Sequence, residues 1–332
     1  MQEADIVISR YFSDKERSAE LLNYCFFQGK DMIKPEYLTE LDGNLNALDE
    51  RKKGEKRYGD QIWKVKLPEA EVLVGVEHQM KVHYFMPFRQ WGYELRQYEK
   101  QYYQILRDMK KRLRDKEFLS GVKKEQKYIP VIRLTVYWNQ KEPWDGEKEI
   151  TSLIKLEGVP DWIQEIIPNY KMNLLEIRDI EDTEKFRTDL RLVLGFLKRM
   201  YNKSELEDFI QDNREEFCQI PEDVYDMIWV LAGERRLKSL KQKIMNEKEM
   251  YDMCKALEDI REESRKQGED AGKKVGMEKG KRVGVKIGKK AGLEIAMKLT
   301  KLLIEDGRVE DLKKATENKK YQTRLLKEYQ LI

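Results

Sequence analysis

The chain contains few of the residues that build disulfide scaffolds or soft metal sites, with three cysteines and two histidines among 332 residues. Cys25, Cys218 and Cys254 lie far apart in the sequence and form no Cys-x-x-Cys pair, which argues against a disulfide framework and favours a reduced, cytoplasmic compartment. His78 and His83 are five positions apart with no cysteine near them, so a zinc site there would lack even a third ligand.

Signals for membranes and for nucleotides are also absent. No run of about 18 apolar residues occurs, so we expect no transmembrane helix and no membrane partner. The N-terminus, MQEADIVISRYFSDKE, lacks the basic-then-apolar layout of a signal peptide, which again favours the cytoplasm. Neither a Walker lysine loop nor a GxGxxG after a strand is present, so nucleotide-dependent chemistry has no motif in its favour.

Charge of both signs is abundant. Charged residues make up 38% of the chain, against about 25% in an average globular protein. Lys and Arg total 65 while Asp and Glu total 62, so the formal net charge is +3. Hydrophobic residues are 40%, which is enough for a core and excludes global disorder. The length predicts roughly two domains.

The small net charge hides two basic segments. Residues 96–127 carry 11 basic and 5 acidic side chains, and residues 268–292 carry 8 basic and 3 acidic ones. Either segment could face a polyanion such as DNA. The alternative is a helix face that is simply solvated.

Hydrophobic periodicity predicts an α/β (α+β) architecture. The expected elements are a helix over 15–28, strands over 62–66 and 71–79 paired as a hairpin, a long helix over 88–113, a strand over 129–138, a short strand over 172–177, and helices from 181 to about 257. An apolar stripe runs along the long helix, and we predict that it is core rather than a base-stacking surface: Phe88, Trp91, Leu95, Tyr98, Tyr102, Ile105, Met109 and Leu113.

The C-terminal part is periodic in glycine. Seven glycines recur every four residues from Gly268 to Gly292, among many lysines and arginines. Each interior glycine costs a helix about 1 kcal/mol relative to alanine, so a helix here would need close packing on a partner. We expect a helical oligomerisation or partner-binding tail, and a flexible basic tail is the alternative.

Three acidic residues are candidates for metal ligands. Glu77 ends an apolar run in a predicted central strand, Asp60 precedes the strand paired with it, and Glu20 lies beside the apolar stripe of the first helix. Carboxylates from two adjacent strands and a packed helix can converge on Mg²⁺ or Mn²⁺, which prefer oxygen ligands. Such an ion would activate water and neutralise charge on a scissile phosphate. The alternative is an ion pair between Glu77 and Arg89, with Asp60 and Glu20 in solvent.

The order of the motifs resembles a known nuclease family. Arg57-Tyr58-Gly59-Asp60 is followed by Val76-Glu77-His78-Gln79 and then by Met86-Pro87-Phe88-Arg89 with Tyr93. Further matches are Ala19-Glu20-Leu21-Leu22-Asn23, Pro130-Val131, Trp144-Asp145-Gly146 and the glycine tail. Together they resemble the recombination-promoting nuclease / putative transposase family (YhgA-like) of the PD-(D/E)XK nuclease superfamily.

The resemblance implies a restriction-endonuclease-like core, in which a small mixed sheet is flanked by helices, and DNA cleavage that depends on Mg²⁺ or Mn²⁺. By their positions in the motifs, Asp60 and Glu77 would be catalytic metal ligands. Glu20 would be a third ligand or a supporting group. Gln79 would be the third catalytic residue, at the position where the superfamily most often has lysine.

Several residues would support this site. Gln79 carries no charge, so it cannot stabilise an oxyanion as lysine does, and Lys64 or Lys81 could supply a cation from nearby. The resemblance implies that Arg89 and Tyr93 position the phosphate or the pair of Glu77 and Gln79. Many relatives have arginine directly before the first acid.

In this chain Gly59 occupies that place, and Arg57, three positions ahead of Asp60, is a candidate for DNA contact. His78 beside the predicted site could bind the scissile phosphate, but a histidine packed on the sheet is the simpler interpretation.

The sequence thus predicts a nuclease-like core over residues 1–178, a helical extension over 179–256 and a basic, glycine-periodic tail over 257–332. We expect a metal-dependent DNA endonuclease that binds DNA mainly through phosphates, assembles as a homo-oligomer through its tail, and acts in recombination or on mobile or foreign DNA. The alternative is a catalytically degenerate DNA-binding or assembly protein, and the neutral Gln79 favours it.

Overall fold

A computed structural model describes residues 2–41, 60–109 and 121–332 of the chain. The helices are α1 (Gln2–Tyr11), α2 (Lys15–Phe27), α3 (Met86–Met109), α4 (Asp161–Ile166), α5 (Leu190–Arg199), α6 (Lys203–Asp212), α7 (Arg214–Phe217), α8 (Glu222–Ala232), α9 (Arg235–Ile244), α10 (Met253–Glu305), α11 (Val309–Glu317) and α12 (Lys319–Glu328). The strands are β1 (Leu38–Leu41), β2 (Asp60–Lys66), β3 (Glu71–Gln79), β4 (Val131–Tyr137) and β5 (Asn173–Glu176). Within the described ranges, no helix is both long and apolar enough to cross a membrane.

The chain divides into two compact units, Met1–Glu258 and Asp259–Ile332. The first unit contains the sheet and α1 to α9, and the second contains most of α10 with α11 and α12. The division into a core, an extension and a tail at residues 178 and 256 remains a prediction.

The sheet has five strands in the order β1-β2-β3-β4-β5. The strands β1, β2 and β3 pair antiparallel, whereas the pairs β3–β4 and β4–β5 are parallel. A parallel pair needs a crossover, and α3 provides it between β3 and β4. The predicted α+β class, with a small mixed sheet flanked by helices, is confirmed. The predicted hairpin of β2 and β3 is also present, and β3 has the predicted boundaries.

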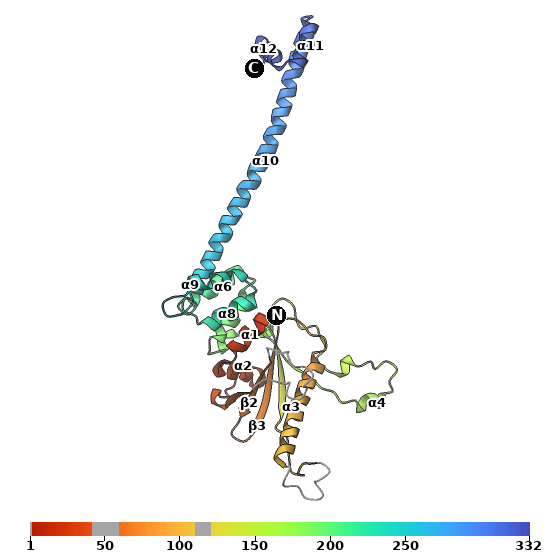
Figure 1. The fold of residues 1–332 in the computed structure, drawn as a ribbon, viewed down its shortest axis with the longest axis vertical. Coiled ribbons are helices and arrows are strands. Elements are labelled where there is room, and N and C mark those ends of the chain that lie inside the picture. The colour runs from red at the N-terminus through yellow and green to blue at the C-terminus, as the bar shows by residue number, and fades with distance from the viewer. Residues whose placement is uncertain (1, 42–59, 110–120) are drawn as a thin grey trace. The chain divides into compact units, whose positions relative to one another are not determined.

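Side chains of β3 alternate between two faces of the sheet, and different helices cover each face (Figure 1). We call the side of Gly75 and Glu77 the α3 face, because Arg89 of α3 forms an ion pair with Glu77 at 2.7 Å. We call the side of His78 the α2 face, because Phe12, just before α2, stacks on the His78 ring with 4.9 Å between ring centroids.

The α2 face is an apolar core that joins the sheet to the helical region. Trp63 and Val76 are buried there together with Leu22 of α2. Arg17, on the outer side of α2, is 7% exposed and forms an ion pair with Asp189, directly before α5, at 2.6 Å. A second carboxylate, Asp223 of α8, also pairs with Arg17. The first helices are thus fastened to α5 and α8 by a buried charge network.

The helix α3 buries a polar face, contrary to the expectation from sequence. Gln90 and Tyr93 are 0% and 2% exposed, whereas Phe88 and Trp91 of the predicted core stripe are 61% and 41% exposed. The sheet beneath α3 carries charged and hydroxyl side chains, and buried polar groups need hydrogen-bonding partners. The prediction that the stripe is core is therefore wrong for the first half of α3. Leu113, the last residue of the stripe, lies outside the described residues.

The glycine-periodic segment is helical. All seven glycines lie in α10, a helix of 53 residues. A Cβ added at any of them, from Gly268 to Gly292, would meet no atom within 4 Å, so the chain's own packing does not require them. Beyond the glycines, Leu299 and Leu303 of α10 form a small core with Ala315 of α11 and Leu325 of α12.

Candidate functional site

Glu77 is the centre of a buried charge cluster on the α3 face. Its side chain is 2% exposed. Its Oε1 accepts hydrogen bonds from Arg89 at 2.7 Å and from the Gln79 amide at 2.8 Å, and its Oε2 lies 3.4 Å from Nη2 of Arg133. A carboxylate is stable in such a buried place because opposite charges compensate it. The ion pair between Glu77 and Arg89, which the sequence left as the alternative, is therefore present.

Arg133 reaches Glu77 because the neighbouring strand has no side chain at the place where its guanidinium lies. Gly75 is the register partner of Arg133 in the β3–β4 pair. A Cβ at Gly75 would lie 2.6 Å from both Cδ and Nη1 of Arg133. Arg133 itself is 1% exposed. Gly75 thus leaves a slot in the sheet that the Arg133 side chain fills.

Tyr93 holds the two arginines. Its hydroxyl accepts a hydrogen bond from Nε of Arg89 at 3.1 Å. Its ring centroid lies 4.6 Å from Cζ of Arg133 and 5.5 Å from Cζ of Arg89. Contacts between a desolvated cation and an aromatic face contribute about 2 kcal/mol. Tyr93 therefore fixes the orientation of the groups that neutralise Glu77.

Polar residues of α3 also form hydrogen bonds with β4, the strand next to Glu77. Gln90 donates a hydrogen bond to Oγ1 of Thr135, the register partner of Glu77 on β4. Glu94 accepts hydrogen bonds from the Tyr170 hydroxyl at 2.8 Å and from the backbone N–H of Arg133 at 3.1 Å. Burial raises the pKa of the Glu94 carboxyl, although both hydrogen bonds oppose the rise.

Asp60 is the first residue of β2 and pairs in register with Glu77. Residues opposite each other in an antiparallel pair are neighbours across the two strands. The register therefore brings the two predicted metal-ligand positions together at one end of the hairpin. Arg57, predicted to contact DNA, lies outside the described residues.

Glu20 forms hydrogen bonds away from the predicted metal site. Its carboxylate accepts hydrogen bonds from the backbone N–H groups of Arg187 and Thr188 and from Oγ1 of Thr188, just before α5. The helix α2, which carries Glu20, covers the face of the sheet opposite to Glu77. These contacts favour a structural role for Glu20 over the predicted role as third ligand.

The two lysines considered as substitutes for a catalytic lysine lie in different places, and Lys64 is distant from Glu77. The Lys64 ammonium is 2.9 Å from the Glu71 carboxylate, at the far end of the hairpin. Lys64 is four residues from Asp60 along β2, a distance of about 13 Å. Lys81 is exposed in the turn after β3, two residues beyond Gln79.

His78 belongs to the core of the α2 face and not to the site. It is 8% exposed, and its Nδ1 accepts a hydrogen bond from the indole of Trp138 at 3.2 Å. Burial lowers the pKa of His78 to about 3, so the ring is neutral at physiological pH. The simpler interpretation, a histidine packed on the sheet, is the one that these contacts support.

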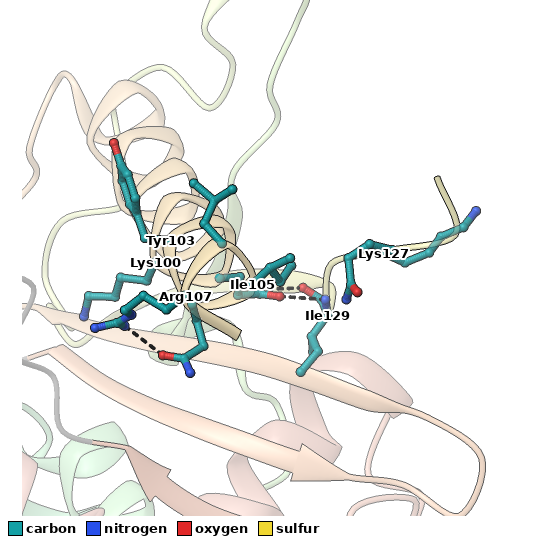
Figure 2. Close-up of a pocket in the computed structure, with 10 residues that line it drawn as sticks. Lys100, Tyr103, Ile105, Arg107, Lys127 and Ile129 are labelled. Atoms are coloured by element: carbon teal, nitrogen blue, oxygen red, sulfur yellow. Dashed lines mark hydrogen bonds between the residues drawn. The ribbon is translucent and has the colours of Figure 1, made fainter. Parts of the chain in front are cut away.

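A basic hollow lies at the other end of α3 (Figure 2). Lys100, Arg107 and Lys127 line it, together with Ile129, two residues before β4. It is about 20 Å from Glu77 along the sheet, because Ile129 lies six residues before Thr135, the register partner of Glu77. These lysines and the arginine belong to the basic segment 96–127, of which residues 110–120 lie outside the described ranges.

Sequence reasoning missed Arg133 and Gly75. A sequence signal for both existed, since Arg133 is the one charged residue in the apolar run IPVIRLTVYW and Gly75 interrupts the run VLVGV. A charge in a central strand needs a buried partner, and a strand glycine often marks a close approach.

A family model matches the chain across this site. The family described as "Putative transposase, YhgA-like" matches residues 51–224, which is 174 of 332 residues and includes β2, β3, α3 and β4. No curated protein and no solved structure matches the chain.

Proposed function

Since the chain belongs to the YhgA-like putative transposase family, we propose that it is a divalent-metal-dependent DNA endonuclease with a PD-(D/E)XK-type core. It would hydrolyse phosphodiester bonds, in recombination or on mobile or foreign DNA. The observation that carries the proposal is the register of Asp60 with Glu77, which sets two acidic positions side by side next to Gln79.

The donor set suits a hard cation. Asp60 and Glu77 supply oxygen ligands, as Mg²⁺ and Mn²⁺ require, and the amide oxygen of Gln79 is a further oxygen donor. When bound, such an ion would lower the pKa of a coordinated water and neutralise charge on the phosphate. Arg89 now forms an ion pair with Oε1 of Glu77, and its side chain is 30% exposed. A metal ion that binds Oε1 would therefore displace Arg89.

The chain's own residues would then act on the phosphate. Arg89, once released from Glu77, would remain near it through its bond to the Tyr93 hydroxyl and could pair with a phosphate oxygen. Arg133 is buried and would stay, holding Oε2 of Glu77 in place. Gln79 would orient the carboxylate through its amide hydrogen bond.

DNA contact would follow α3. The basic hollow of Lys100, Arg107 and Lys127 lies about 20 Å from Glu77, within the span of a short duplex or single strand crossing the sheet. The exposed rings of Phe88 and Trp91, in the first turns of α3, could stack with unpaired bases. Contact mainly through phosphates predicts binding that weakens steeply with salt and shows little base preference.

Self-association through α10 is part of the proposal. A Cβ added at any of the seven helical glycines would meet no atom, so the glycines leave a smooth, slowly winding strip on which a second copy could approach closely. Without such packing they only lower the stability of the helix.

A second candidate function is a catalytically degenerate DNA-binding protein with the same fold. The charge of Glu77 is already balanced by Arg89 and Arg133, and the neutral Gln79 stands where a lysine is usual in the superfamily. In that case DNA binding and self-association would occur with no cleavage under any metal.

Nicking of supercoiled plasmid tests the two candidates. With Mg²⁺ or Mn²⁺, the wild type should nick DNA, and Asp60→Asn and Glu77→Gln should reduce the rate at least about a hundredfold. The amide substitutions keep the shape of each side chain. Glu77→Gln still removes the anion that two arginines share, which costs about 3–5 kcal/mol, so its circular dichroism must match wild type for the lost activity to count.

Glu71→Gln is the matched control, because Glu71 lies on the same face of the same strand but pairs with Lys64. It should retain full activity. Equal nicking by wild type and both site variants would reveal a contaminating nuclease and refute the proposal.

A further inference from the structure

Two cysteines that are distant in sequence meet in the fold. Cys218 follows the C-terminus of α7, and Cys254 lies in the first turn of α10, 36 residues later. The two sulfur atoms and a carboxylate oxygen of Asp252 lie within 4.8 Å of one another. The cysteine spacing gave no sign of this cluster, and only the tertiary structure brings the three side chains together.

A backbone contact creates this cluster. Ile220 and Tyr251 form an antiparallel bridge, with both of its N–H···O hydrogen bonds at 2.9–3.1 Å. The bridge holds the segment after α7 against the segment before α10. Asp252 caps α10, since its Oδ1 accepts a hydrogen bond from the N–H of Lys255 at 2.9 Å. The cluster therefore rests on ordered backbone within the first unit.

We propose that Cys218, Asp252 and Cys254 bind a thiophilic divalent cation such as Zn²⁺, with two sulfur ligands, one carboxylate oxygen and a water molecule. In a tetrahedral zinc site with Zn–S bonds near 2.3 Å, two sulfur atoms are about 3.8 Å apart. The present separations need a contraction on the order of 1 Å or less, which side-chain rotation can supply.

The local charge fits such an ion. Two thiolates and one carboxylate would carry three negative charges against two positive ones, and Arg214, whose charge acts on Cys254, compensates the excess. Burial, and then the neighbouring Cys218, raise the pKa of the Cys254 thiol to about 12. The Cys254 thiol therefore stays protonated without metal, and metal binding would release its proton.

This site differs in chemistry from the oxygen donors around Glu77. Hard Mg²⁺ prefers carboxylates, whereas thiolates select softer ions. A spectroscopic signal that arises only from sulfur ligands therefore reports this cluster even when Mg²⁺ is present. The inference does not rest on the proposed nuclease activity.

Cobalt spectroscopy on the full, reduced chain tests the proposal. Co²⁺ should produce the thiolate-to-cobalt charge-transfer band with one ion per chain, and Zn²⁺ should abolish that band by displacement. Cys218→Ser should lose the band and bind Zn²⁺ at least about tenfold more weakly in competition with a chromophoric chelator. Asp252→Asn, which keeps the cap on α10, should weaken Zn²⁺ binding while both thiols remain.

Cys25→Ser is the matched control, because Cys25 is a free cysteine outside the cluster. It should show the band unchanged. The proposal is overturned if wild type gives no thiolate band, or if Cys218→Ser retains it while its circular dichroism matches wild type. It is also overturned if Cys218 and Cys254 prove to be joined as a disulfide, and the protein binds no Co²⁺ after reduction.

Discussion

At the scale of single residues, the site is defined by how one carboxylate is neutralised. Glu77 is almost fully buried, yet it carries its charge because Arg89 approaches from α3 and Arg133 from β4. Arg133 can do so only because Gly75 has no side chain. The site therefore depends on an absent methyl group as much as on its charged residues.

Gly75→Ala tests that dependence. The new Cβ would overlap Cδ and Nη1 of Arg133, and overpacking of this kind costs about 1–3 kcal/mol. We expect a lower free energy of unfolding in urea and loss of plasmid nicking, since Arg133 would be pushed from Glu77. Gly92→Ala on α3 is the control, because its Cβ would meet no atom within 4 Å. Equal stability of the two variants would show that the slot is not tight.

His78 should make the stability of the protein depend on pH. Burial lowers its pKa to about 3 in the folded state, whereas an unfolded histidine titrates near 6.5. Below about pH 6.5 the unfolded chain therefore binds a proton that the folded chain does not, and stability is lost as the pH falls through this window. From pH 7 to about pH 5 the loss is about 2 kcal/mol.

Urea unfolding at both pH values measures this loss. His78→Gln should remove about 2 kcal/mol of the pH dependence, because glutamine keeps an acceptor for Trp138 but does not titrate. His83→Gln, which changes the other, exposed histidine, should leave the wild-type profile unchanged. A His78→Gln profile parallel to wild type would contradict the burial of a neutral ring.

At the scale of elements, α3 shows that an amphipathic pattern does not predict which face of a helix packs against the sheet. The helix places Gln90, Tyr93 and Glu94 over the charged α3 face and leaves Phe88 and Trp91 exposed. Burying the apolar side instead would remove the contacts of Arg89 with Glu77, of Tyr93 with Arg133 and of Gln90 with Thr135, at about 1–3 kcal/mol for each buried group left unsatisfied.

Two aromatic truncations on α3 should therefore differ sharply. Phe88→Ala should change the free energy of unfolding by less than about 1 kcal/mol, because the ring is 61% exposed. Tyr93→Ala should cost about 3 kcal/mol or more, since it removes a buried ring and its contacts with Arg89 and Arg133. Chemical denaturation measures the free energy of unfolding of both variants. A large loss in Phe88→Ala would mean that the stripe is core after all.

At the scale of the whole molecule, packing within the chain does not explain the glycines of α10. Seven interior glycines together cost about 7 kcal/mol of helix stability, and no atom of the chain contacts the places where side chains would be. We interpret the strip as a surface for a second copy.

Replacing Gly276, Gly280 and Gly284 together by alanine separates the effect of the glycines on helix stability from their effect on self-association. The variant should gain about 1 kcal/mol of helix stability per position and lose self-association, because methyl groups would hold the copies apart. Thermal circular dichroism and sedimentation velocity measure these quantities. Glu278→Ala, on another side of α10, should associate like wild type. Unchanged association of the triple variant would exclude the glycine strip as the interface.

Periodicity alone located most of the sheet. The alternation in IWKVK and the apolar run in EVLVGVEHQ predicted the β2–β3 hairpin, and β3 has the boundaries expected for it. The resemblance of the motifs to a known family named Glu77, Gln79, Arg89 and Tyr93, which lie in the cluster, and the register places Asp60 opposite Glu77. Local patterns suffice here because strand pairing in a tight hairpin follows from short-range sequence.

Contacts between distant segments were decided by the tertiary structure. Arg133 contacts Glu77 because the α3 crossover places β4 beside β3. Glu20 accepts hydrogen bonds from the segment before α5. Cys218 and Cys254 lie together because a backbone bridge joins the segments that carry them. A periodic pattern tells which residues of an element share a face, but not which surface that face meets. That choice depends on the balance of buried charge and hydrogen bonds across the whole core, which no single segment contains.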